Sequence, residues 1–186
     1  MTRFDISDTS LSGVKLITRK IMGDNRGFLT RLFCAEILKT AGWTKPIAQI
    51  NQTMTKRKGT VRGMHFQHPP HAEMKLISCI FGEILDIAVD LRKDSPTFLQ
   101  WHAEKLSAEN ANALLIPEGV AHGFQTLTDN VELLYCHSAA YSPTFEAGVN
   151  PNDPALAILW PLEIVDLSER DKKHPMINTS FEGIIL

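Results

Sequence analysis

The stretch Gly63-Met64-His65-Phe66-Gln67-His68-Pro69-Pro70-His71-Ala72-Glu73-Met74-Lys75 lies between runs of strand-like residues and is rich in polar groups. It holds three of the seven histidines of the chain, and Arg62 comes directly before it. So many polar groups beside apolar runs indicate a functional site built on a β-sheet and not a core segment. We expect His65 to act as a base and Lys75 to stabilise the negative charge that the base creates.

The segments on either side of this stretch predict an all-β fold. Short apolar or alternating runs, separated by turn residues, predict strands at 14–20, 28–33, 46–54, 60–67, 74–81, 83–91, 98–106, 113–116, 123–127 and 131–137. Residues 35–40 predict a short helix, and Ser168 is expected to cap a second one. No βαβ rhythm or glycine-rich phosphate motif occurs. The pattern is typical of a barrel or sandwich, with one domain over residues 1–186.

Composition narrows the class of protein. A net charge of -2 does not favour a role in binding nucleic acid or a polybasic role at a membrane. No apolar run approaches the roughly 20 residues that a membrane-spanning helix needs, and the N-terminal residues lack a signal-peptide pattern. The cysteines are three in number and widely spaced, so we expect Cys79 and Cys136 to be buried thiols in a reducing cytoplasm.

Side-chain alternation predicts which residues share a face. In the strand at 60–67, alternation separates Arg62, Met64 and Phe66 from Gly63, His65 and Gln67. The strand at 46–54 alternates polar and apolar residues, which predicts a polar row facing a cavity. Lys75 lies in an apolar strand, where a lysine extends to solvent or faces a polar interior.

Each candidate also has a plain structural interpretation. A lone histidine in a strand is more often structural than catalytic, and His68 and His71 in the proline loop are expected at the surface. Tyr135 fits a core tyrosine, but a phenol is also protonated at neutral pH and can donate that proton. Asp171 fits a solvated or capping residue, or a carboxylate that orients His65.

Two short patterns resemble the motifs of cupin jelly rolls: Gly59-x5-His65 and Pro117-x-Gly119-x-x-His122. Metal-binding cupins have a second histidine and a glutamate where this chain has Gln67 and Lys75. A cation in place of a carboxylate repels a divalent ion, and two histidines make a poor site. We therefore expect no metal.

Longer motifs make the chain similar to the dTDP-4-dehydrorhamnose 3,5-epimerase family from about residue 24 to residue 171. The matching stretches include Val61-Arg62-Gly63-Met64-His65-Phe66-Gln67, Val89-Asp90-Leu91-Arg92-x-x-Ser95-Pro96-Thr97-Phe98, Ile116-Pro117-x-Gly119-x-Ala121-His122-Gly123-Phe124 and Tyr141-x-Pro143-x-x-Glu146. The resemblance implies a jelly roll that needs no metal or cofactor, forms a homodimer and acts on a nucleotide-diphosphate 4-keto-6-deoxy sugar.

The resemblance also implies roles for individual residues. His65 is expected to remove the proton next to the ketone, with Asp171 as its partner, and Lys75 to stabilise the enolate. Tyr135 is expected to return a proton from the opposite face. The implied substrate-contacting residues are Arg26, Arg31, Gln49, Asn51, Arg62, Gln67, His122, Glu146 and Arg170.

One position departs from the family pattern Arg-Gly-x-Phe-x-Glu. Here the sequence is Arg26-Gly27-Phe28-Leu29-Thr30-Arg31, so Arg31 replaces a glutamate associated with the nucleotide end. Thymine and uracil carry a donor at N3, which a carboxylate can accept, whereas cytosine has an acceptor there. Arg31 therefore raises the hypothesis of a cytidine-linked substrate; the alternative is that it contacts phosphate or solvent.

Three other functions remain open on the sequence. A related 3,4-ketoisomerase would use similar proton transfers without inverting a carbon centre. A sugar-binding jelly roll without activity would exchange no protons with solvent. A metal-dependent cupin oxygenase would contain metal.

Overall fold

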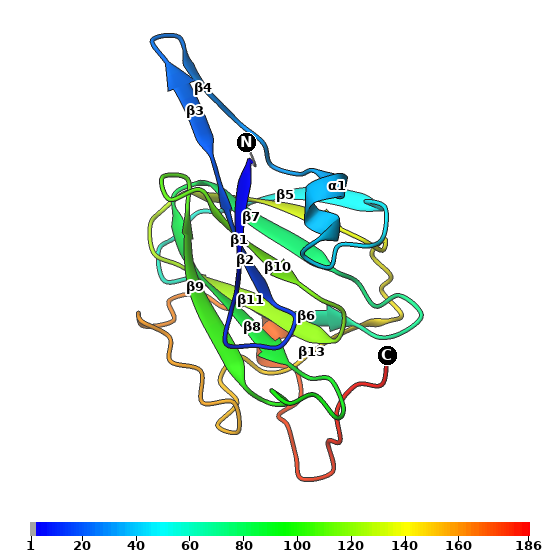
Figure 1. The fold of residues 1–186 in the computed structure, drawn as a ribbon. Helices are drawn as coiled ribbons and strands as arrows, with labels where there is room; N and C mark the ends of the chain where they lie inside the picture. Colours follow the sequence, from blue (N-terminus) through cyan, green and yellow to red (C-terminus); the bar gives the residue numbers. More distant parts are fainter. Residues whose placement is uncertain (1–2) are drawn as a thin grey trace.

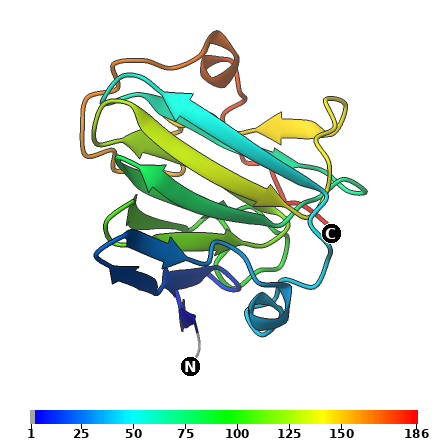
Figure 2. The ribbon, with the colours of Figure 1, turned by 90° about the horizontal axis from the view of Figure 1, so that it is seen from above.

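The computed structural model describes residues 3–186 and consists mainly of two antiparallel sheets packed face to face (Figures 1 and 2). The six-stranded sheet contains, in spatial order, β1 (Phe4–Asp8), β2 (Lys15–Arg19), β10 (Asn112–Ile116), β7 (Lys75–Phe81), β12 (Val131–His137) and β5 (Gln49–Thr55). The five-stranded sheet contains β13 (Glu146–Gly148), β6 (Val61–Gln67), β11 (Val120–Thr126), β8 (Glu83–Asp90) and β9 (Trp101–Ser107). From β5 to β12 the chain crosses repeatedly between the sheets, and the predicted all-β jelly roll is confirmed.

Apolar side chains fill one end of the space between the sheets. Ile77 and Leu133 from the six-stranded sheet meet Ile84 and Phe124 from the five-stranded sheet in one buried cluster. Interdigitation of two inner faces is the usual core of a sandwich. Tyr135 belongs to the same cluster and is 9% exposed, because the core ends there and a polar cavity begins.

The outer faces of both sheets are partly covered. Helix α1 (Ala35–Lys39) packs against the six-stranded sheet through Leu38, which shares a buried cluster with Trp43. The C-terminal part of the chain covers the other sheet, where Leu156 and Ile184 join a third buried cluster. Helix α2 (Glu169–Lys172) lies in that part, and Ser168 caps it by accepting the Asp171 amide, as the sequence predicts.

A bulge in β6 overturns the alternation predicted for Arg62. Residues 62 and 65 of β6 pair with residues 124 and 122 of β11, so β6 carries one extra residue between them. Gly63 has φ +130°, and an added Cβ there would lie 2.5 Å from Gly123 Cα. The extra residue turns the strand, so that Arg62 and His65 line the same pocket, as bulges near functional sites often do.

Strand β5 turns its polar row inward, which confirms the cavity-facing row predicted for it. Gln49, Asn51 and Thr53 line the pocket, whereas Ile50 and Met54 on the opposite side are 56% and 46% exposed. The strand stands at the end of its sheet, so one of its edges has no neighbouring strand to pair with.

The hairpin of β3 (Ile21–Asp24) and β4 (Gly27–Thr30) extends away from the two sheets (Figure 1). Its side chains are almost entirely exposed, including Phe28 at 71% and Leu29 at 69%. This hairpin therefore contributes little to the core of its own chain.

Several strand predictions need correction. Residues 98–100 form a turn and not the start of a strand, because Leu99 has φ +60° and the Gln100 amide bonds the Thr97 carbonyl. Strands β1, β3 and β13 were not predicted, and the strand predicted at 28–33 ends at Thr30.

None of the helices within residues 3–186 has the length and apolar character needed to cross a membrane.

Candidate active site

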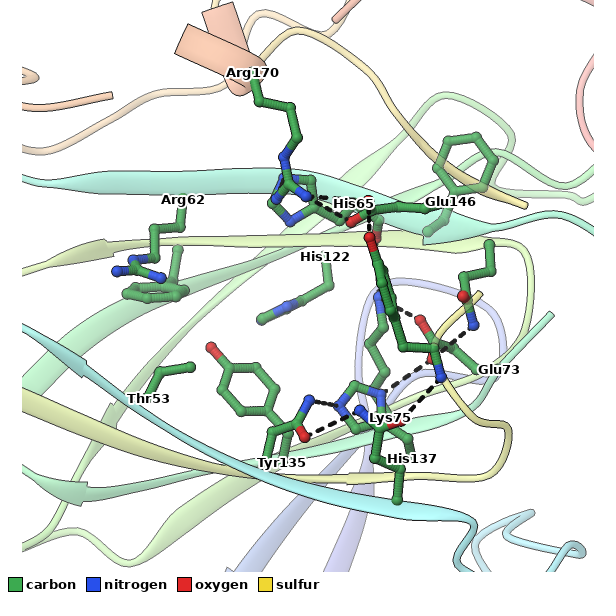
Figure 3. Close-up of a pocket in the computed structure, with 16 residues that line it drawn as sticks. Thr53, Arg62, His65, Glu73, Lys75, His122, Tyr135, His137, Glu146 and Arg170 are labelled. Atoms are coloured by element: carbon green, nitrogen blue, oxygen red, sulfur yellow. Dashed lines mark hydrogen bonds and ion pairs between the residues drawn. The ribbon is translucent and has the colours of Figure 1, made fainter. Parts of the chain in front are cut away.

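A pocket opens between the two sheets, and side chains from both of them line it (Figure 3). His65 and Arg62 come from β6 and His122 from β11 in one wall, while Lys75 and Tyr135 come from β7 and β12 in the other. The remaining lining residues are Gln49, Asn51, Thr53, Phe66, Gln67, Glu73, Phe124, His137, Tyr141, Glu146 and Arg170. The structure thus brings the predicted base and the predicted cation into one cavity.

His65 and Asp171 form a hydrogen-bonded pair at one wall. His65 Nε2 lies 2.7 Å from Asp171 Oδ1, and the Gly63 amide donates to Oδ2 at 3.3 Å. Burial acts to raise the pKa of Asp171, but the hydrogen bond and charge of His65 outweigh it and lower the pKa to about 2. An ionised carboxylate can only accept, so Nε2 carries a proton. The lone pair of neutral His65 is therefore on Nδ1, where it can accept a proton.

Acid should weaken the fold through Asp171. Its folded pKa of about 2 lies below the ordinary 3.8, so the unfolded chain binds more protons between these values. The stability from this pair is then complete above about pH 4 and lost as pH falls toward 2. A pKa difference of one unit between the folded and unfolded states corresponds to roughly 1.4 kcal/mol. We therefore expect the free energy of unfolding of Asp171→Asn to vary with pH by about 2 kcal/mol less than that of the wild type over this range. Urea unfolding at several acidic pH values measures it; curves parallel to those of the wild type would contradict the prediction, and exposed Asp129→Asn is the control.

Arg170 connects this pair to the pocket mouth. Its guanidinium donates to Glu146 at 2.9 Å and 3.0 Å, and the Tyr141 hydroxyl donates to the same carboxylate at 2.8 Å. Arg170 also approaches His65 Nε2 to 3.2 Å, but a nitrogen that donates to Asp171 cannot accept there. Arg170 thus places a positive charge beside His65 without a hydrogen bond to it.

Lys75 enters the pocket from the opposite sheet and is held by two acceptors. Its Nζ donates to the His65 carbonyl at 3.0 Å and pairs with Glu73 Oε1 at 3.1 Å. Only 7% of the Lys75 side chain is exposed. A cation enclosed this way acts strongly on a nearby oxyanion, because little water screens it.

Tyr135 and His122 line the pocket side by side, and His122 pairs with the buried carboxylate of Asp86. His122 Nε2 lies 2.7 Å from Asp86 Oδ1, and both side chains are buried. Burial raises the pKa of Asp86 and His122 opposes this shift. The His122 ring meets the Tyr135 ring edge-on at 5.9 Å. Burial also raises the pKa of Tyr135, so its phenol keeps its proton at neutral pH.

Most of the residues predicted from the sequence line this pocket: His65, Lys75, Tyr135, Gln49, Asn51, Arg62, Gln67, His122, Glu146 and Arg170. Asp171 lies behind His65. The Gln67 amide is already occupied, because its oxygen accepts from the Ser142 amide at 2.6 Å and its nitrogen donates to Glu73 at 3.1 Å. Its contacts support the pocket wall.

Arg26 and Arg31 do not reach the pocket of their own chain. Arg26 is 86% exposed at the tip of the hairpin and pairs with Asp24 at 2.6 Å. Arg31 follows the hairpin and lines a separate surface hollow with Arg3 and Lys20. Neither arginine lines the pocket between the sheets, so a single chain does not place them on a ligand there.

Sequence reasoning missed Glu73, Asp86 and His137. Glu73 precedes Lys75 by two residues and His137 follows Tyr135 by two, so each shares a face with a predicted residue. That period of two is the signal that would have found them. Asp86 is buried and pairs with His122 across neighbouring strands, and a single sequence does not reveal that pairing.

One group of potential metal ligands occurs within the described part of the chain: His65, Asp171 and His174, whose ligand atoms lie within 4.8 Å of one another. Arg170 lies 3.2 Å from His65 Nε2 and 3.5 Å from Asp171 Oδ1. A permanent cation at these distances opposes a divalent ion. The two histidines of the cupin-like motifs, His65 and His122, each bond a carboxylate of their own. His65 bonds Asp171, and His122 bonds Asp86.

Residues 8–179 match the family model described as dTDP-4-dehydrorhamnose 3,5-epimerase. The chain belongs to the dTDP-4-dehydrorhamnose 3,5-epimerase family. A relative of that name from Salmonella typhimurium is 40% identical over 172 residues, which are 91% of this chain and 93% of the relative.

Solved structures of this epimerase family have the same fold. A Bacillus anthracis dTDP-4-dehydrorhamnose 3,5-epimerase with TDP and PPi bound has a TM-score of 0.90 and 41% identity, over 94% of this chain and 99% of that one. A Legionella pneumophila dTDP-6-deoxy-D-glucose-3,5-epimerase in complex with dTDP-4-keto-L-rhamnose has a TM-score of 0.91 and 37% identity, over 98% and 99%. The family resemblance deduced from the sequence is confirmed.

Proposed function

We propose that this protein epimerises a dTDP-linked 4-keto-6-deoxy hexose at C3, C5 or both, without a cofactor. The observation that carries the proposal is the pairing of His65 with Asp171 in a pocket that Lys75 and Tyr135 enter from the other sheet. The relatives that bear the epimerase name, and the one that holds dTDP-4-keto-L-rhamnose, support this substrate class.

The chemistry begins with a carbon acid. The ketone acidifies the neighbouring C–H bond, and His65 Nδ1 takes the proton while Asp171 holds the Nε2 proton and stabilises the imidazolium. The electron pair moves onto the ketone oxygen, where the Lys75 ammonium stabilises the enolate. Because His65 and Lys75 hydrogen-bond through the His65 carbonyl, base and cation keep a fixed separation.

Inversion needs a proton from the other face of the ring. Tyr135 stands on β12, in the sheet opposite the one that carries His65, and its phenol is protonated at neutral pH. As the enolate collapses to the ketone, its carbon takes the Tyr135 proton, which gives the inverted centre. The Tyr135 phenolate then regains a proton from solvent, and the His65 imidazolium releases its proton to solvent.

The proposal is tested by NMR in heavy water with dTDP- and CDP-linked 4-keto-6-deoxy sugars. We expect deuterium uptake next to the ketone, inverted product and a preference for dTDP. An inverted centre separates an epimerase from a 3,4-ketoisomerase, and an absence of uptake with every sugar would indicate a binding protein. A clear CDP preference would instead support the hypothesis drawn from Arg31 and contradict the dTDP assignment.

Tyr135→Phe should separate exchange from inversion. The variant keeps the ring but loses the donated proton, so we expect inversion to fall by about 10²-fold while deuterium uptake falls less. The measurement is the ratio of deuterium content to inverted product by NMR. Equal losses of uptake and inversion would argue against Tyr135 as the proton donor.

We also propose that two copies associate and that each supplies Arg26 and Arg31 to the site of the other. Both arginines are displaced from their own pocket, and the exposed Phe28 and Leu29 of the same segment offer apolar surface for contact. Sedimentation of the wild type should then give a dimer. A monomer at micromolar concentration would contradict this part of the proposal.

A further inference from the structure

Glu73 lies in the pocket wall where three strands meet, and its carboxylate receives three donors. Its Oε1 pairs with Lys75 Nζ at 3.1 Å, and its Oε2 accepts from Gln67 Nε2 at 3.1 Å and from His137 Nδ1 at 3.1 Å. The donors belong to β7, β6 and β12, so the carboxylate joins the two sheets. Only 8% of the side chain is exposed, and an enclosed carboxylate needs such partners.

The charge of Glu73 is held in place by these same contacts. Burial acts to raise the pKa of Glu73, but the His137 hydrogen bond and the Lys75 charge outweigh it, so the pKa falls below its usual range. Glu73 is therefore an anion beside Lys75 across the neutral pH range. The carboxylate therefore places a negative charge 3.1 Å from the enclosed ammonium of Lys75.

The hydrogen bonds of the Lys75 ammonium leave one donor for a ligand. An ammonium group has three N–H donors. The His65 carbonyl and Glu73 account for two of them within residues 3–186, and the third remains for a ligand in the pocket. Two fixed acceptors from different elements define the direction of that third donor.

We infer that Glu73 is a positioning residue that fixes Lys75, charged and aimed, for the developing enolate oxygen. The inference rests on the proposed function for its catalytic consequence. It assigns to Glu73 no contact with substrate: Glu73 acts through Lys75, and His137 and Gln67 orient the carboxylate for that purpose.

The kinetic test compares Glu73→Gln with Glu73→Asp. The glutamine keeps the shape but removes the charge, so we expect kcat for deuterium exchange to fall about 10- to 100-fold. KM should stay within about twofold, because Lys75 acts as charge develops on the oxygen. The aspartate restores the anion and should recover part of the rate. Glu182→Gln, which breaks the exposed Lys93–Glu182 ion pair, is the matched control and should leave the rate unchanged.

A second test needs no substrate. Protons of an immobilised ammonium exchange slowly with water, so the wild type should show a Lys75 ¹H–¹⁵N ammonium signal, assigned by its loss in Lys75→Arg. We expect this signal to disappear in Glu73→Gln and to return in Glu73→Asp. Circular dichroism and thermal unfolding show whether each variant is folded.

The outcomes separate this inference from the proposed function. A Glu73→Gln protein that keeps the ammonium signal, or that exchanges deuterium at the wild-type rate, would overturn the role of Glu73. A second outcome concerns the wild type. If the wild type exchanges no deuterium, while the ammonium signal is lost in Glu73→Gln and returns in Glu73→Asp, the epimerase proposal is overturned and the positioning of Lys75 by Glu73 stands.

Discussion

Replacing His65 with Asn is expected to abolish both deuterium uptake and epimerisation, with a fall of about 10³-fold or more. The amide of asparagine cannot take a proton at neutral pH, so the first step of the proposed reaction has no base. Asn also leaves the ionised Asp171 with the Gly63 amide but without its imidazole partner. Loss of exchange, and not only of product, is the diagnostic result, because exchange reports the first proton transfer alone.

His68→Asn is the matched control for this experiment. His68 lies three residues further along the chain, on the exposed loop that follows β6, and it does not line the pocket. The same chemical change there should leave turnover unaltered. Near-normal turnover of His65→Asn, with His68→Asn also active, would contradict the assignment of the base.

Much of the fold follows from local patterns in the sequence. The strand predicted at 131–137 agrees with β12, and the Ser168 cap of α2 was foreseen. Strand β13 was missed because it has three residues, too few to show any alternation, and pairing with β6 is what makes it a strand. Its existence depends on a distant partner and not on its own residue types.

The bulge in β6 shows where local patterns fail for the site. Strict alternation separates Arg62 from His65, whereas the extra residue at Gly63 places both in the pocket. A glycine in a strand is a weak hint of a bulge. What requires glycine is the approach of β11, since a Cβ on Gly63 would meet the Gly123 backbone at 2.5 Å, and that contact joins segments far apart in the sequence.

The charged contacts of the site were the hardest part to foresee. The sequence indicates that Lys75 either faces a polar interior or extends to solvent, but it does not indicate which carboxylate pairs with it. Glu73 and His137 meet only because β7 and β12 are neighbours in the six-stranded sheet, with His137 opposite Lys75. The contact depends on the order of the strands in the sheet, which cannot be predicted from either segment alone.

Lys75→Met is expected to lower kcat by about 10²- to 10³-fold, the usual cost of removing one preorganised donor to an oxyanion. Methionine is close to lysine in length and fills the same space, so the loss concerns charge and not packing. Glu73 then keeps His137 and Gln67 as donors, which limits the damage to the fold. The measurement is the rate of deuterium uptake at saturating sugar nucleotide.

Two comparisons make the Lys75 result interpretable. Lys75→Arg keeps the positive charge on a planar group that does not reproduce the point geometry of an ammonium, so partial activity is expected. Lys105→Met removes an exposed lysine from β9 and should change nothing.

Binding should respond differently from chemistry in Lys75→Met. In the proposed reaction Lys75 acts on the ketone oxygen as charge develops there, and dTDP alone carries no ketone. The dissociation constant for dTDP should therefore stay within about twofold of the wild type while exchange collapses. If Lys75→Met lost dTDP affinity in proportion to its rate, Lys75 would belong to the diphosphate site and the enolate would need another cation, for which Arg62 and Arg170 in the same pocket are the candidates.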